Sequence, residues 1–548
     1  MTGEPTEQIV VGWLGGESGH RAFFGGQASA GRWVMLGVVL VTAMVLTITV
    51  GWQGLAFGLV GSVVVLAVTA RTHRGTILER QRARSRWRAR RRLGTDRFEP
   101  YDPARWEQLG EQVKRGPKTA RRAAVAARAA MRANPDGADG MGWLQCSANE
   151  PGVAWHAPMG EEEYLSVAFS VSGQLIGIQS TAVLARAAKA WSGYLAAAAP
   201  ASRLVDGVQV MTRVLPPDSV RQRFWAAQAL DPAAPDAAKQ SYAEVIERAG
   251  AGSMVQRHYV VVRWPVSAAF LDAAGRYGTG RDGWRALMHA EIEAAVRGLG
   301  KARMGRVVPL SARQTAALIL HQQNPSRPVD AVRDVDPEQL GIASRDELSA
   351  HVVSATGWTT GEPVQWWHRT ASIRAEDMAV GPRTQLWVLG LLLGDLPFLR
   401  TLAFHLRLVP AGEAKAAARQ DLTRDTADAI SDRQHGRLAN DTTTTARTAS
   451  QRRTDDLAAG SGHHGVEWIG YITVTAGGRD ELARACRRLQ ETCAQELGIE
   501  ALAWQDSYQA SASGTTWPIG RGLRSSKSSA ASRMYERLAG RAEKEAIA

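Results

Sequence analysis

The sequence predicts an α+β protein in which an N-terminal hairpin of transmembrane helices precedes mixed strand-helix-strand domains in the cytoplasm. Three observations lead to this prediction. Residues 33–70 contain no charged side chain, a run of arginines follows them directly, and the remainder of the chain alternates between strand-like and helix-like segments. A chain of 548 residues is also too long for one ordinary hydrophobic core, so we expect several domains.

The uncharged stretch is best explained as two membrane spans. As one helix its 38 residues would extend about 57 Å, against a hydrocarbon core of about 30 Å. Two spans, 33–50 and 55–70, joined by a turn at 51–54, remove this mismatch. The predicted membrane-anchoring residues are the interfacial indoles and the small residues that let the helices approach closely: Trp33, Trp52, Gly54, Gly58 and Ser62. A hairpin buried in a protein interior is the alternative.

The arginines set the predicted orientation and the predicted contact with anionic lipid. They are Arg71, Arg74, Arg80, Arg82, Arg84, Arg86, Arg88, Arg90, Arg91 and Arg92. The turn of the hairpin carries no charge, so the positive-inside rule places both termini in the cytoplasm and the chain in the inner membrane as a two-span protein. A cleaved signal peptide is not expected, because residues 1–32 lack a basic n-region.

The excess of positive charge is confined to one segment. Residues 71–132 hold 19 Lys and Arg against six Asp and Glu, which accounts for the whole net charge of +13. Between positions 80 and 90 the arginines recur at every second residue, which on a helix scatters them around the circumference instead of forming one reading face. Contact with nucleic acid through residues 71–132, or docking of a protein on this segment, remain alternatives to lipid contact.

Composition changes and turn signals suggest seven parts. They are a cytoplasmic N-terminal segment (1–32), the transmembrane hairpin (33–70), a basic juxtamembrane helical segment (71–140), a first cytoplasmic α+β domain (141–325), a linker (326–362), a second α+β domain with a long crossover helix (363–523), and a Ser-rich tail with a short helix (524–548). The crossover, 411–459, is polar and includes four consecutive threonines. We expect an extended helix there that is broken near the threonines, with a disordered insert as the alternative.

The sequence offers little chemistry. It contains neither GxxxxGK[ST] nor HExxH, and the glycines near residue 520 lack the Lys-Ser/Thr order that binds phosphate and Mg²⁺. His463 and His464 have no third ligand at metal spacing, and the three cysteines lack the spacing of a metal site. We therefore expect no catalytic residue, no metal and no cofactor, and we predict that the protein is not an enzyme.

Several stretches resemble a conjugation-type (type IV) secretion machine. The N-terminal GWLGGESGHRAFFGG, with the two expected spans and their basic exit, looks like the small inner-membrane subunit of that machine. Residues from about 150 to 523 look like the N-terminal, membrane-docking half of its large assembly ATPase. The supporting stretches are ILHQQNP (319–325), HRTASI (368–373), LPFLRTLAFHLRLVP (396–410), WIGYITVTAGGRDELARACRRL (468–489) and TTWPIGRGL (515–523).

The chain departs from the family where the ATPase domain should begin, because only the Ser-rich tail follows. The resemblance therefore implies a non-enzymatic inner-membrane scaffold that docks a separate P-loop secretion ATPase, with residues 515–523 and the C-terminal helix nearest to it. Other inner-membrane channel subunits are the further implied partners, in an oligomeric complex. The alternatives are a membrane subunit of type VII secretion, which exports protein, and a membrane-tethered nucleic-acid-binding protein.

Overall fold

The computed structural model describes residues 11–14, 30–69, 71–72, 75–158, 162–174, 179–217, 226, 228–250, 254–378, 381–384, 388–393, 396–434, 441–458, 461–499 and 502–522. The chain forms two compact units, one of Ser18–Arg92 and one of Leu93–Ala548 together with Met1–Glu17. The expected N-terminal segment and the Ser-rich tail lie largely or wholly outside the described residues. Together the described elements make a mixed α and β protein with one large sheet.

The smaller unit is helical. Its elements are α1 (Ala30–Val50), α2 (Trp52–Thr69), the short strands β2 (Arg71–Thr72) and β3 (Gly75–Thr76), and α3 (Ile77–Leu93). α1 and α2 pack against each other as a hairpin, and Gly51, with a φ of 77°, makes the turn between them. A positive φ costs glycine little, which is why this residue can reverse the chain here.

Among the described residues, no helix combines the length and the apolar character that crossing a membrane requires. The prediction of a transmembrane hairpin, and with it that of a two-span inner-membrane protein, is therefore wrong. The division of the uncharged stretch leaves α2 with 18 residues, which rise about 27 Å against the roughly 30 Å of a hydrocarbon core. α1 is longer, but threonines interrupt its apolar sequence, and Thr42 and Thr47 donate hydrogen bonds to carbonyls one turn back.

The larger unit is built on one sheet of 14 strands, most of them antiparallel. In chain order they are β4 (Arg97–Pro100), β5 (Met131–Arg132), β6 (Met141–Gln145), β7 (Val153–His156), β8 (Tyr164–Val171), β9 (Gly207–Leu215), β10 (Val255–Pro265), β11 (Val307–Pro309), β12 (Ser344–Glu347), β13 (Ala350–Thr356), β14 (Pro363–Ile373), β16 (Leu399–Val409), β17 (Gly465–Ala476) and β18 (Ala503–Trp504). Outside this sheet, β1 (Val11–Leu14) pairs with β15 (Gly381–Thr384).

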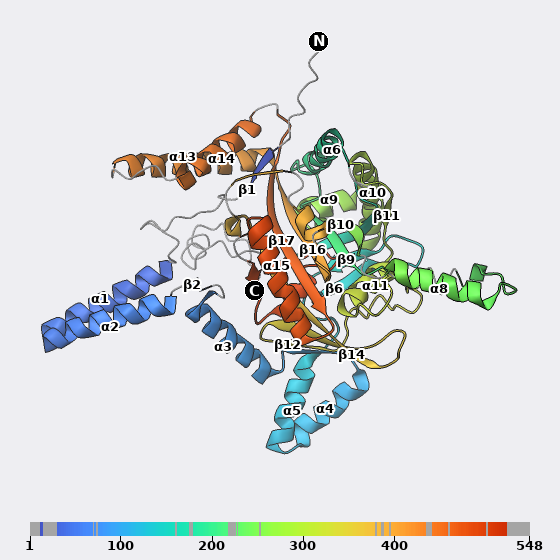
Figure 1. Ribbon diagram of the computed structural model, residues 1–548, viewed down its shortest axis with the longest axis horizontal. Coiled ribbons are helices and arrows are strands. Elements are labelled where there is room, and N and C mark those ends of the chain that lie inside the picture. The colour runs from blue at the N-terminus through green and yellow to red at the C-terminus, as the bar shows by residue number, and fades with distance from the viewer. Residues whose placement is uncertain are drawn as a thin grey trace, which may run out of the picture. The chain divides into compact units, whose positions relative to one another are not determined.

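The helices of this unit connect the strands. They are α4 (Pro103–Arg115), α5 (Lys118–Ala130), α6 (Thr181–Ala198), α8 (Asp236–Gly250), α9 (Ala268–Gly275), α10 (Gly280–Lys301), α11 (Ala312–Gln323), α12 (Leu389–Leu393), α13 (Ala411–Gln434), α14 (Asp441–Asp456), α15 (Arg479–Glu496) and α16 (Gln509–Gly514), with a 3₁₀ turn at Ala375–Asp377. The expected crossover helix is thus two helices, α13 and α14, which pack against each other (Figure 1).

The sheet contains the same strand arrangement twice. In the first module the neighbours run β11-β8-β10-β9, and in the second they run β18-β14-β17-β16. Each module therefore follows the split βαβ topology, in which the first and third strands lie side by side at the centre. Each also carries a helical insertion between its second and third strands, which is α8 in the first module and the α13–α14 pair in the second. The two modules join where β9 pairs with β16, a junction that we call the seam.

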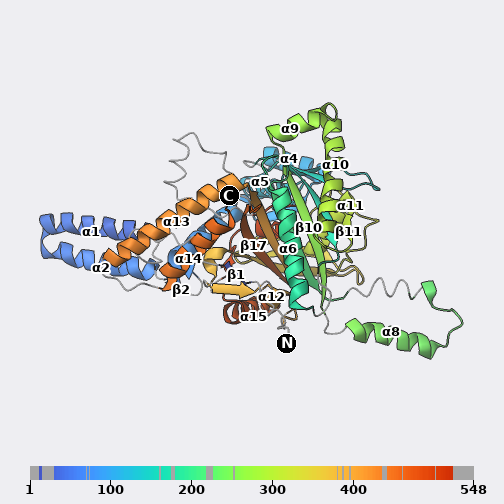
Figure 2. The ribbon, with the colours of Figure 1, turned by 90° about the horizontal axis from the view of Figure 1, so that it is seen from above.

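Side-chain alternation gives the sheet two different faces. On one face Val208 and Leu402 point into hydrophobic clusters that α10 covers in the first module and α15 in the second. Figure 2 shows α6 lying along β10, and Figure 1 shows α15 across the strands of the second module. The opposite face carries many polar side chains and is covered by α11 and by residues 507–522. We call it the polar face.

Candidate functional site

The polar face at the seam is the candidate site. Two pairs of opposed polar residues come from β9 and β16, namely Gln209 with His405 and Arg213 with Thr401. All four are buried or nearly so, and Gln209, Arg213 and Thr401 are each 1% exposed. Polar groups are found in protein interiors where hydrogen bonds satisfy them, so the partners of these side chains define what the site does.

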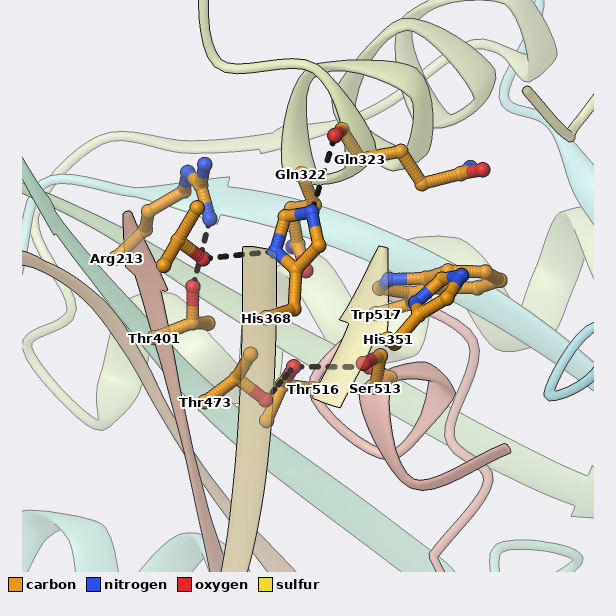
Figure 3. A pocket seen from close by; sticks show the side chains of 11 residues that line it. Arg213, Gln322, Gln323, His351, His368, Thr401, Thr473, Ser513, Thr516 and Trp517 are labelled. Atoms are coloured by element: carbon orange, nitrogen blue, oxygen red, sulfur yellow. Dashed lines mark hydrogen bonds between the residues drawn. The ribbon is translucent and has the colours of Figure 1, made fainter. Parts of the chain in front are cut away.

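All five stretches that carry the family resemblance line one small cavity on this face. They contribute Gln322 and Gln323 from α11, His368 from β14, Thr473 and Thr475 from β17, and Thr516 and Trp517 from the C-terminal segment (Figure 3). The fifth stretch adds Thr401, which comes from β16. Sequence positions almost two hundred residues apart therefore meet at one point of the interior.

Residues 515–520 cross the seam and are fixed to it by side chains of the sheet. The Gln209 amide donates to the carbonyl oxygens of Thr515 (3.3 Å) and Trp517 (2.9 Å), and its oxygen accepts from the backbone N–H of Gly520 at 2.8 Å. His405 Nε2 donates to the Thr515 carbonyl at 2.7 Å, and the Tyr164 hydroxyl donates to that of Ile519 at 3.3 Å. The backbone of this segment is therefore held by hydrogen bonds to side chains of the sheet.

Hydroxyl groups form a second network beneath the segment. Thr370 and Thr473 are 2.8 Å apart, Thr473 and Thr516 are 2.9 Å apart, and the Thr516 hydroxyl donates to the Ser513 carbonyl at 2.9 Å. Because Thr516 donates to a carbonyl, it accepts from Thr473, which in turn accepts from Thr370. His368 is held in the same way, between the Thr475 hydroxyl (2.9 Å) and the Gln323 carbonyl (3.1 Å).

Burial keeps the histidines of this region uncharged at neutral pH. It lowers the pKa of His405 to about 4 and takes the pKa of His368 well below its ordinary value. On α15, burial raises the pKa of Cys486 to about 11 and that of Cys493 to about 12, so both thiols stay protonated at neutral pH. A protonated, buried thiol is a poor nucleophile. These groups are arranged to hold the interior together rather than to react.

The predicted docking edge, 515–523, has a different position from the one we expected. Trp517 is 2% exposed and Ile519 is fully buried, so these residues form part of the core. Only the end of the stretch approaches the surface, where Arg521 forms an ion pair with Asp139 at 2.5 Å. His463 and His464 bond to backbone groups at the base of the α13–α14 pair, through the Asp456 carbonyl and the Ala411 N–H. The described residues contain no group of three His, Cys, Asp or Glu able to hold a metal ion.

The predicted membrane-anchoring residues belong to the smaller unit. Trp33 falls within α1, and Trp52 begins α2 with 75% of its surface exposed. Gly54 and Gly58 lie at the contact between the two helices, where a Cβ on Gly58 would approach that of Ala43 to 2.5 Å. Ser62 is half-buried on α2. The small residues therefore allow the close helix approach that their spacing predicts.

The predicted arginines are mostly exposed along α3. Arg71 falls within β2 and Arg74 lies outside the described residues, while the others are Arg80, Arg82, Arg84, Arg86, Arg88, Arg90, Arg91 and Arg92. Of these, Arg80 and Arg90 are half-buried, and the Arg91 guanidinium lies 5.4 Å from the centre of the Trp87 ring. Contact with anionic lipid or with nucleic acid through this helix stays a prediction.

Sequence reasoning missed Gln209 and Arg213, which do most to build the site. A signal was present, since both sit in a strand whose neighbours are apolar (VQVMTRV), at positions that share one face. A charged residue inside such a strand must find partners in the interior. Comparison with known proteins adds no relative, because no family model matches the chain and neither does any curated protein sequence.

Proposed function

We propose that this protein is a non-enzymatic scaffold of a conjugation-type secretion machine, which docks a separate secretion ATPase. The observation that carries the proposal is the meeting of the five resembling stretches at the seam, where they form the polar face and fix residues 515–520. The resemblance concerns the part of an assembly ATPase that precedes its nucleotide-binding domain. In that family the segment resembling residues 515–523 leads into the nucleotide-binding domain. Rigid attachment of this segment to the sheet suits a protein that positions an ATPase.

The side chains at the seam support a structural role. His368 uses both ring nitrogens in hydrogen bonds to other parts of the interior, and the hydroxyls of Thr473 and Thr516 bond to each other. Such a network specifies one arrangement of the strands and of the segment that crosses them. A docking platform needs this rigidity, because the partner must meet a surface of constant shape.

We assign ATPase docking to the surface at the end of segment 515–522, next to the seam. Arg521 pairs with Asp139 there, at the end of the buried segment. Because residues 515–520 are buried, the contact must be made by the residues beyond Gly522 and by the surface around the Arg521–Asp139 pair.

Co-purification tests this proposal. The full-length chain should retain one secretion ATPase of its own cell, and a chain truncated after Gly522 should lose it. A matched control is the double variant Arg276→Ala, Asp272→Ala, which removes an exposed ion pair of α9 and should retain the partner. If the intact chain captures none of these ATPases at low salt, docking of a secretion ATPase is not its function.

Deletion of the gene separates the two kinds of transport. Loss of conjugal DNA transfer with protein export intact is the expected phenotype. Loss of export of folded proteins with normal conjugation would assign the chain to a type VII machine instead.

A further inference from the structure

α3 carries the densest positive charge of the described helices. Its 17 residues, Ile77–Leu93, include eight arginines and one acidic residue, Glu79 (Figure 1). The exposed arginines are Arg82, Arg84, Arg86, Arg88, Arg91 and Arg92. Like charges at this density repel one another along the helix, and a polyanion bound to the helix relieves that repulsion.

The exposed arginines cover the whole outward side of α3. The half-buried residues Arg80, Ala83, Trp87 and Arg90 recur three and four positions apart, so they form one face of the helix. At 100° per residue, the exposed arginines spread over about 220° on the other side. Guanidinium groups therefore point outward and along both flanks, and they do not form a single stripe.

The exposed side of α3 does not suit insertion into a lipid surface. Among the described side chains of this helix, the exposed large apolar ones are Ile77 and Leu93, which lie at its two ends. The central Trp87 is half-buried, with the Arg91 guanidinium 5.4 Å from its ring centre. A helix that lies in a membrane interface buries an apolar face there, and a flat layer of headgroups meets only one side of a helix.

The major groove of double-stranded DNA matches the arrangement of the arginines. This groove is about 12 Å wide, it admits an α-helix, and the phosphates of the two strands border it on both sides. Arginines on both flanks of one helix can therefore reach both strands at once. The major groove of double-stranded RNA is deep and narrow, so it does not admit a helix in this way.

We propose that α3 binds the phosphate backbone of double-stranded DNA without sequence preference. The contacts are charge-assisted hydrogen bonds from the guanidinium groups to phosphate oxygens, which position a protein on a duplex but carry no sequence information. This activity is separate from ATPase docking, because we assign docking to residues of the larger unit and α3 belongs to the smaller one.

Binding of DNA duplexes by the full-length chain tests this proposal. Six arginines that each displace a counterion give a slope of log K against log salt of about −5, so the affinity should fall about a thousandfold between about 50 and 200 mM salt. Duplexes of equal length and unrelated sequence should bind equally well. Double-stranded RNA of the same length should bind at least several-fold more weakly.

Variants assign the binding to α3. Arg82→Gln with Arg88→Gln removes one charge from each flank, so it should bring the slope to about −3 and weaken binding at least tenfold at low salt. Arg484→Gln with Arg487→Gln is the matched control, because it removes two charges from exposed positions of α15 and should change the affinity less than about twofold. All four side chains are exposed, so neither variant should lower the Tm.

Vesicles of phosphatidylcholine and phosphatidylserine provide the competing ligand. An Arg82, Arg88 double variant that loses vesicle binding but keeps its DNA affinity would show that α3 contacts lipid headgroups and would overturn the proposal. Equal losses of DNA affinity in the α3 and α15 variants would also overturn it, since net charge alone would then explain binding. A native chain that binds no duplex at low salt would do the same.

Discussion

Two fully buried arginines, Arg213 and Arg400, show how differently one residue type is accommodated. Arg213 has few partners and faces a cavity. Arg400 lies on the opposite face and donates to four carbonyl oxygens, those of Leu391, Leu392, Leu396 and Phe398, at 2.6–3.1 Å. Two of these carbonyls belong to α12, so Arg400 caps the C-terminal end of this five-residue helix.

Replacing Arg400 by Met should lower the free energy of unfolding by about 3 kcal/mol or more, because several buried carbonyls lose their charged donor at once. Arg407→Met is the control on the same strand, since the Arg407 guanidinium forms a solvent-exposed ion pair with Glu467. That variant should cost less than about 1 kcal/mol. Urea unfolding measures both, and equal effects would contradict the capping role.

His405 should make the stability of the protein depend on pH. Its pKa is about 4 in the folded chain, against an ordinary value of 6.5, so the unfolded chain binds protons more readily between these values. Its contribution is complete above pH 6.5 and is lost as the pH falls towards 4, by about 3 kcal/mol in total. His405→Gln can still donate to Thr515, and its unfolding free energy should fall less steeply with acidification. Parallel pH profiles for the two proteins would refute the assignment.

At the level of elements, the small residues of the α1–α2 hairpin allow its two helices to pack closely. A Cβ at Gly54 would collide with the backbone of Thr47, and one at Gly61 would lie 3.9 Å from the Cβ of Val39. The spacing of small residues predicted this contact correctly, whereas the prediction that the hairpin spans a membrane failed.

A disulfide can report on this contact, because 3.9 Å between Cβ atoms suits the geometry of the bond. The pair Val39→Cys, Gly61→Cys, in a chain with Cys146→Ser, should oxidise readily to an intrachain bond. Adding Gly58→Ile should separate the helices and slow the reaction at least several-fold. Gly37→Ile is the control, because a Cβ there meets nothing within 4 Å. Equal oxidation rates in the two variants would exclude the packing described.

At the scale of the larger unit, the main feature is that two split βαβ modules share one sheet and one covering segment. Gln209 of the first module fixes residues 515–520, which also bond to His405 of the second. The seam therefore depends on both halves of the sequence.

Gln209→Leu should loosen this segment, because the Gly520 N–H loses its acceptor and the Thr515 and Trp517 carbonyls each lose one donor. Amide hydrogen exchange of residues 515–520 should accelerate at least tenfold, whereas exchange in α10 should change little. Gln112→Leu, at an exposed position of α4, serves as the control. Unchanged protection of the segment would mean that its packing alone holds it.

The sequence predicted individual elements better than it predicted their assembly. Apolar and polar residues alternate along parts of β9 and β16, and Ser311 caps α11, so these local features can be recognised in the sequence. The pairing of β9 with β16 was not predictable, because nothing in two strands almost two hundred residues apart specifies their register. The sequence VQVMTRV also does not indicate which groups form hydrogen bonds with Arg213. The prediction of a transmembrane hairpin failed for another reason. The absence of charged residues does not show that a helix is long enough and apolar enough to cross a membrane.

The pairing of β9 with β16 has a consequence for how the gene can be divided. In each split βαβ module the second strand lies at the edge. An unpaired edge strand of eight or more residues can pair with another extended chain through its free backbone N–H and C=O groups. In this protein the two edge strands, β9 and β16, pair with each other. Either module made alone would expose the unpaired backbone groups of this edge strand and would aggregate, so the two modules need to be made as one polypeptide.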